Sequence, residues 1–161
     1  MAAYPLDPPP IPFDPARGLV VGGVAGLVAV LVFHQGTLGI LRDLGVGGAA
    51  PFAMDPTRPF GIPRVWSSAL WGGAWGVALA IALHRLDSLR LVAAATLFGA
   101  LAPSLVAWFV VAPLAGEPAA AGFAPSPLLA VLVPNAAWGL GTGAGLNLVG
   151  RTHAGARLAR A

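Results

Sequence analysis

The chain of 161 residues carries a formal net charge of +3, yet only 9% of its residues are charged and 57% are hydrophobic. A typical soluble domain has about 25% charged residues, so this composition excludes an ordinary water-soluble surface. The absence of cysteine excludes disulfides, thiolate metal sites and cysteine nucleophiles. All basic residues are arginines scattered at the ends of apolar blocks, which favours a role in membrane topology over nucleic-acid binding.

The N-terminal segment, residues 1–17, is rich in proline and contains Asp7 and Asp14 before its first basic residue, Arg17. We expect this segment to be extended. A secretory signal peptide needs a basic start and a short apolar stretch with a cleavage site, and neither precedes the first long apolar block. We therefore expect no cleavage.

Four apolar blocks follow, at residues 18–41, 65–83, 91–114 and 128–149, and none contains Asp, Glu, Lys or Arg. Each has the roughly 20 residues that a helix needs to cross a bilayer. A backbone in lipid must satisfy its own hydrogen bonds, which favours helices. The sequence predicts an all-α membrane protein, with a four-transmembrane-helix bundle at 18–150 and a basic tail at 151–161.

The arginines predict the orientation of this bundle. An even number of crossings puts both termini on one side of the membrane. Six arginines lie on that side: Arg17, Arg85, Arg90, Arg151, Arg157 and Arg160. Three lie on the other: Arg42, Arg58 and Arg64. The positive-inside rule then predicts cytoplasmic termini. The use of arginine alone, with abundant glycine, proline and alanine, is typical of a GC-rich bacterial genome, so we expect a multi-pass protein of the bacterial inner membrane.

Two connections differ in character. The segment at 44–63 holds four prolines and four glycines, which predicts a tight irregular loop, and its Asp55 and Arg58 are candidates for an ion pair. The 84–90 turn is short, which predicts that the second and third helices are antiparallel neighbours.

The second half of the chain resembles the first. Trp71 and Gly72 in the second block match Trp138 and Gly139 in the fourth, and Arg17 before the first block matches Arg90 before the third. Each half has two spans, so the two copies run in the same direction. The pattern predicts two parallel two-helix repeats, related by an axis along the membrane normal.

Glycines recur at four-residue spacing and form candidate helix-packing faces. They are Gly22, Gly26, Gly72, Gly76, Gly139 and Gly143. Small residues let helix backbones approach closely in lipid, where helices have no hydrophobic drive to associate. These faces can hold the bundle itself together, which we favour for most of them, or join a membrane-protein partner or a second copy.

The spans contain a small set of polar residues that form a possible intramembrane site: His34, Gln35, Thr37, Ser68 and Asn135. Polar groups at membrane depth usually face the bundle interior or a cavity. We expect His34 to hydrogen-bond to a neighbouring helix, and the alternative is a ligand, ion or proton site. His84 lies at a different depth, so the pair cannot hold one haem. We predict no metal, no cofactor and no catalytic residue.

Three motifs carry a resemblance: FHQGTLGIL at 33–41, PFGIP at 59–63 and WGGAWG at 71–76. With them the chain resembles a set of uncharacterised bacterial integral membrane proteins with four spans. The resemblance implies a class of protein and no catalytic residue.

Three functions fit these patterns. The one that we favour is a non-enzymatic structural or accessory subunit that packs through its glycine-rich faces. The second is a small channel or transporter for a small polar solute, for which we expect an oligomer because four helices enclose little space. The third is a subunit of a redox complex with a quinone or pigment near His34.

Overall fold

The computed structural model describes residues 15–158, and the side chains of residues 16–150. The predicted extended segment lies outside these residues except at its end, because the first helix already begins at Pro15. The side chains of the predicted basic tail also lie outside them, although the last helix continues to Leu158.

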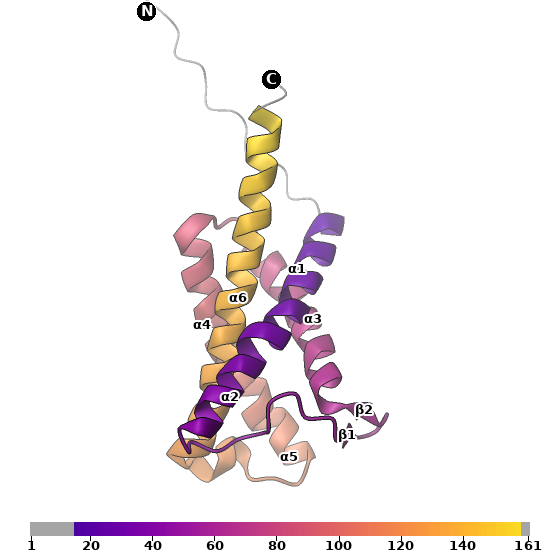
Figure 1. Ribbon diagram of the computed structural model, residues 1–161, viewed down its shortest axis with the longest axis vertical. Coiled ribbons are helices and arrows are strands. Elements are labelled where there is room, and N and C mark those ends of the chain that lie inside the picture. The colour runs from indigo at the N-terminus through magenta and orange to yellow at the C-terminus, as the bar shows by residue number, and fades with distance from the viewer. Residues whose placement is uncertain (1–14, 159–161) are drawn as a thin grey trace, which may run out of the picture.

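Within the described part of the chain, four helices are long and apolar enough to cross a membrane, as the apolar blocks predict. These are Ala16–Asp43, Arg64–Ala82, Ser88–Leu114 and Pro125–Gly150. The sequence therefore folds as an all-α bundle (Figure 1).

Two of these helices change their winding part-way along. The first consists of α1 (Pro15–Ala29), the π-helical turn η1 (Val30–His34) and α2 (Gln35–Asp43). The third consists of α4 (Ser88–Val106), the π-helical turn η2 (Ala107–Val111) and α5 (Ala112–Leu114). The second and fourth helices are α3 (Arg64–Ala82) and α6 (Pro125–Leu158).

Short elements connect the helices. A hairpin of β1 (Pro56–Thr57) and β2 (Ile62–Pro63) leads into α3, and the left-handed turn η3 (Ala119–Phe123) leads into α6. We call residues 44–63, which join α2 to α3, the cap. Figure 1 shows the cap crossing one end of the bundle, between the diverging ends of α2 and α3.

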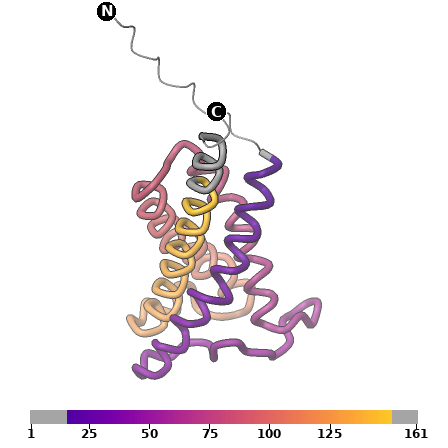
Figure 2. Tube along the Cα trace, turned by 45° about the horizontal axis from the view of Figure 1, so that its top comes forward, coloured from indigo at the N-terminus to yellow at the C-terminus, as the bar shows by residue number. Residues whose placement is uncertain are grey.

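The helices pack as two pairs, α1 with α3 and α4 with α6, and α1 and α6 bring the pairs together (Figures 1 and 2). Glycines lie at both pair contacts. A Cβ atom built on Gly26 would lie 2.9 Å from Gly76 Cα, and one built on Gly99 would lie 2.7 Å from Gly139 Cα. Such distances leave no room for a side chain, so each pair is held by direct backbone contact.

The six glycines of the predicted packing faces lie in these two contacts. Gly22 and Gly26 face Gly72 and Gly76 across α1 and α3. On α6, Gly139 faces Ala95 and Gly99 of α4, and Gly143 lies one turn further along against the same helix.

Trp138 joins the two pairs at the centre of the core. Its side chain is 2% exposed, and its indole Nε1–H donates a hydrogen bond of 2.9 Å to the carbonyl oxygen of Gly26. The link therefore runs from α6 to the same turn of α1 that contacts α3. At the end of the bundle away from the cap, the Arg17 guanidinium lies 3.4 Å from the carbonyl oxygen of Val149 and adds a second link between these helices.

The second and third helices are joined by a short turn, as the sequence predicts, but they pack mainly on other helices. Their contact includes an edge-to-face pair of Trp75 and Phe98, with ring centroids 6.0 Å apart. The glycine faces on α1 and α6 explain why α3 and α4 pack elsewhere. Each of these two helices approaches a glycine face more closely than it approaches the other helix.

We predict that Gly26→Ala destabilises the bundle by about 1–3 kcal/mol, the usual range for overpacking a filled core. The added methyl would collide with the carbonyl of Gly72. Gly36→Ala is the matched control, because a Cβ there meets nothing within 4 Å. The measurement is the free energy of unfolding in mixed micelles, and equal stability of the two variants would contradict the prediction.

Candidate functional site

A cavity of about 870 Å³ lies between the four helices at the capped end of the bundle. It begins at the glycine contacts, where it is lined by Val30, Gly72, Pro103 and Trp138. From there it extends to the cap. Its volume falls in the range of small-molecule sites, which measure roughly 300–1,000 Å³. All of its walls come from one chain, so no second copy is needed to form it.

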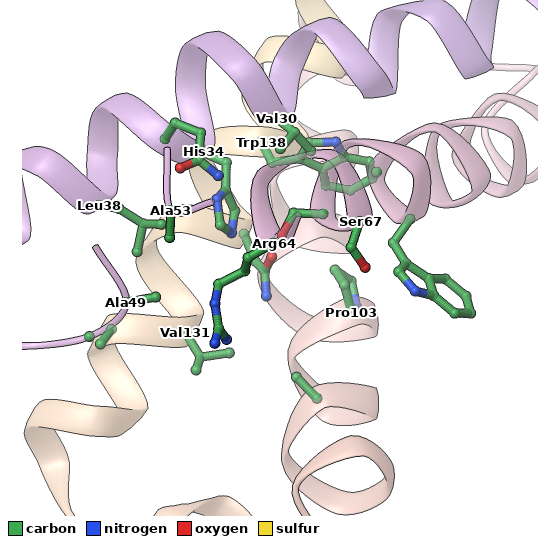
Figure 3. A pocket seen from close by; sticks show the side chains of 18 of the residues that line it. Val30, His34, Leu38, Ala49, Ala53, Arg64, Ser67, Pro103, Val131 and Trp138 are labelled. Atoms are coloured by element: carbon green, nitrogen blue, oxygen red, sulfur yellow. The ribbon is translucent and has the colours of Figure 1, made fainter. Parts of the chain in front are cut away.

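Four of the five predicted polar residues line this cavity: His34, Gln35, Ser68 and Asn135. Thr37 does not, because its hydroxyl donates a hydrogen bond of 2.7 Å to the carbonyl of Phe33 on its own helix. The cavity adds Ser67, which the sequence interpretation did not single out. In Figure 3, His34, Ser67 and Arg64 point into the space between the helices.

His34 lies at the end of the π-helical turn η1. Its Nδ1 atom is buried and has no hydrogen-bond partner among the residues that the structure describes. The expected hydrogen bond to a neighbouring helix is therefore wrong for this nitrogen, because the facing helices diverge here and leave the cavity in its place. A buried polar atom without a partner is unfavourable, and a polar group of a bound molecule within hydrogen-bond distance would remove that penalty.

Asn135 and Ser68 line the cavity from different helix pairs. The Asn135 side-chain nitrogen donates a hydrogen bond of 3.0 Å to the hydroxyl of Ser104 on α4. Ser104 is fully buried, and it lies next to Pro103, which is inside α4. The bond fixes the asparagine at the cavity wall.

The cap is tied down at three places. The Phe52 N–H donates a hydrogen bond of 2.7 Å to the side-chain oxygen of Gln35, which is only 3% exposed. The Val65 N–H donates to the carbonyl of Ala53 over 3.0 Å, and the Ser126 hydroxyl donates to the carbonyl of Val46. The cap is thereby connected to α2, α3 and α6. The sequence predicts an irregular loop here, and its role as a cavity wall is an additional finding.

Glycine permits the cap to lie this close to α6. Gly48 has a φ of +106°, which L side chains rarely adopt, and a Cβ built on it would lie 3.1 Å from the Cβ of Ala130. Any larger residue at this position would push the cap away from the cavity.

The expected ion pair between Asp55 and Arg58 is wrong, since Asp55 binds Arg64 with an Nε to Oδ2 distance of 3.1 Å. The hairpin explains why Asp55 pairs with Arg64 and not with Arg58. Asp55 precedes β1 and Arg64 follows β2, and antiparallel pairing of Pro56 with Pro63 brings these neighbours together. Arg58 sits in the turn at the other end of the hairpin. Both arginines line the cavity.

The cavity reaches the side of the bundle between α3 and η2. Trp71 on α3 and Val111 on η2 both line it, and they are 68% and 56% exposed. These two helices make little contact with each other, so the wall is incomplete on this side. The opening faces the apolar surface of the bundle.

Both π-helical turns lie in the walls of the cavity. Val30 and His34 come from η1, and Ala107 and Val111 come from η2. In η1 the Gln35 N–H bonds to the carbonyl of Val30, five residues back. Such turns often occur at functional sites. No sequence pattern in these apolar segments indicates them.

Comparisons with known proteins do not extend this description. No family model matches the chain, and neither a curated protein nor a solved structure matches it. The resemblance to four-span bacterial membrane proteins stays a prediction.

We predict that Gln35→Leu loosens the cap, because the Phe52 N–H loses its acceptor, a loss worth about 1–3 kcal/mol for a buried group. Amide hydrogen exchange in residues 46–53 should accelerate. Thr37→Val is the control, since that hydroxyl bonds only to its own helix. Unchanged exchange in the Gln35 variant would show that the hydrogen bond does not hold the cap.

Proposed function

We propose that this chain is a multi-pass protein of the bacterial inner membrane that binds a small molecule in the cavity beneath its cap. The unpartnered Nδ1 of His34, in a cavity of about 870 Å³ lined by further polar groups, carries this proposal. Transport of that molecule is the channel or transporter alternative from the sequence, and the cavity supports its binding step.

The outward faces of the helices support insertion in a membrane. Large apolar side chains cover them, including Val20, Val24, Leu97, Leu101 and Leu148. Soluble monomers rarely expose contiguous apolar surface on this scale. With the arginine distribution, this favours both termini in the cytoplasm and the cap on the outer side.

The two packed pairs support the parallel repeat. In each pair, a glycine on the first helix of the pair meets a glycine of the Trp-Gly motif on the second helix. The contacts are Gly26 with Gly72 and Gly99 with Gly139. The first helix of each pair also contains one π-helical turn, η1 or η2. An internal duplication accounts for these shared features.

The geometry favours binding over an accessory role. The glycine faces that argue for a partner are occupied inside the bundle, where each of the six predicted glycines meets another helix of the same chain. They are not available for packing on a second protein. The cavity is not explained by an accessory role.

Orientation can be tested with single cysteines, because the chain has none of its own. We expect a membrane-impermeant maleimide to label Met54→Cys, in the cap, on intact cells. Leu86→Cys, in the turn between α3 and α4, should react only after permeabilisation. Both positions are exposed. The reverse pattern would contradict the orientation, and labelling of both positions in a cytosolic fraction would contradict membrane insertion.

Binding can be tested by filling the cavity. We expect native mass spectrometry of the protein taken from membranes to show a retained small molecule, and Ala107→Phe to lose it because residue 107 lines the cavity. Ala93→Phe, on an exposed face of α4, is the matched control. Absence of a bound mass in the unaltered protein, or equal retention by both variants, would oppose the proposal.

A further inference from the structure

We infer that the ligand is a single-chain amphiphile with one negative charge, such as a long-chain carboxylate, which enters from the outer leaflet. This inference rests on the proposed binding function. It commits to the chemical class of the ligand and to its route.

The charged side chains at the cavity indicate that the headgroup of the ligand is anionic. Arg58 and Arg64 line it, and none of its described lining residues is acidic. Asp55 pairs with Arg64, so two positive charges less one negative charge leave a net charge of +1. No ion pair is found for Arg58 among the described residues. A monoanion would neutralise the site, and a guanidinium binds a carboxylate through charge-assisted hydrogen bonds.

The remaining charged groups at this end do not alter the balance. Arg42 and Asp43 end α2, and Glu117 lies between α5 and η3. None of the three lines the cavity. The charged groups at the cavity are therefore the two arginines and Asp55, the partner of Arg64, and their net positive charge favours an anion over a cation.

The apolar wall at the deep end of the cavity indicates that the ligand has an alkyl tail. Beyond the polar middle, the cavity is lined by apolar and aromatic side chains, among them Val30, Trp75, Val106 and Trp138. This surface offers an alkyl chain contact without polar groups to desolvate. A small hydrophilic anion would leave it unfilled.

The position of the opening indicates the route by which the ligand enters the cavity. The cap covers the end of the bundle and is tied to α2, α3 and α6, and the incomplete wall lies between α3 and η2. Trp71 and Val111 at that wall face the lipid side. In the proposed orientation this opening lies in the outer leaflet. A carboxylate in a bilayer sits near the interface with its chain inside, which matches arginines at the cap and apolar walls below.

Trp138 gives a reporter inside the cavity. It lines the wall and is 2% exposed, so surrounding lipid does not reach it. A variant with the other four tryptophans replaced by phenylalanine leaves it as the only source of indole fluorescence. Two of the four, Trp71 and Trp75, line the cavity, so thermal unfolding of the unaltered protein is measured with each probe alongside the variant. Bromine on a bound chain quenches that fluorescence by contact.

The experiment uses this variant in phosphatidylcholine nanodiscs and four brominated probes. They are 12-bromododecanoate, 12-bromododecanol, 12-bromododecyltrimethylammonium and 4-bromobenzoate. We expect saturable quenching by the carboxylate, with roughly tenfold weaker binding of the alcohol, the effect of losing one charge-assisted hydrogen bond. The ammonium and the benzoate should give no saturable quenching.

Two arginine variants test the headgroup site. Arg58→Gln should remove the preference of the carboxylate over the alcohol. Arg42→Gln, on an arginine outside the cavity lining, should keep it. If the tryptophan variant does not fold, thermal unfolding of the unaltered protein replaces it, and dodecanoate should raise the midpoint more than dodecanol.

The outcomes separate the two proposals. Equal saturable binding of the carboxylate, the alcohol and the ammonium would overturn the anionic headgroup but leave a ligand cavity, and an alcohol preference would indicate a neutral amphiphile. Equal binding of benzoate would overturn the amphiphile and point to a water-soluble anion. If no probe quenches Trp138 saturably or shifts the midpoint, the proposed binding function itself fails.

Discussion

The close contact of glycine backbones is the constraint on which the rest of this structure depends. At Gly26 with Gly76, and at Gly99 with Gly139, two helices meet without a side chain between them. Straight helices that touch at one point must separate on either side of it. Toward the cap the sequence supplies larger and polar residues on the inner faces, and the space between the diverging helices becomes the cavity. The contact and the cavity are thus two parts of one geometry.

The link between the two pairs explains why the cavity opens on one side. Trp138 binds the carbonyl of Gly26, which draws α6 against α1 and closes that wall. On the opposite side α3 and α4 make little contact, which includes the edge-to-face pair of Trp75 and Phe98. An asymmetric bundle of this kind gives the cavity a side opening without any moving part. The cap then needs only to close the end, which its three ties accomplish.

The helices and most of the polar site were predictable, because blocks without charges identify spans and polar residues within spans are few. His34, Gln35, Ser68 and Asn135 were therefore found from the sequence, and the cavity brings them together. The π-helical turns were not, because their extra residue depends on packing rather than on local composition. The prediction that Asp55 pairs with Arg58 was wrong for a related reason. Proximity in sequence favoured Arg58, whereas a hairpin of only two residue pairs places Arg64 beside it.

The unpartnered nitrogen of His34 bears on how stability and function are balanced. Leaving a polar atom buried without a partner opposes folding, and a valine or leucine at this position would avoid the penalty. The fold tolerates it because the glycine contacts and the hydrogen bond from Trp138 to Gly26 hold the helices together at the deep end of the cavity, away from the cap. Stability is thereby concentrated in one half of the bundle. The other half is free to keep a space that the helices alone do not fill.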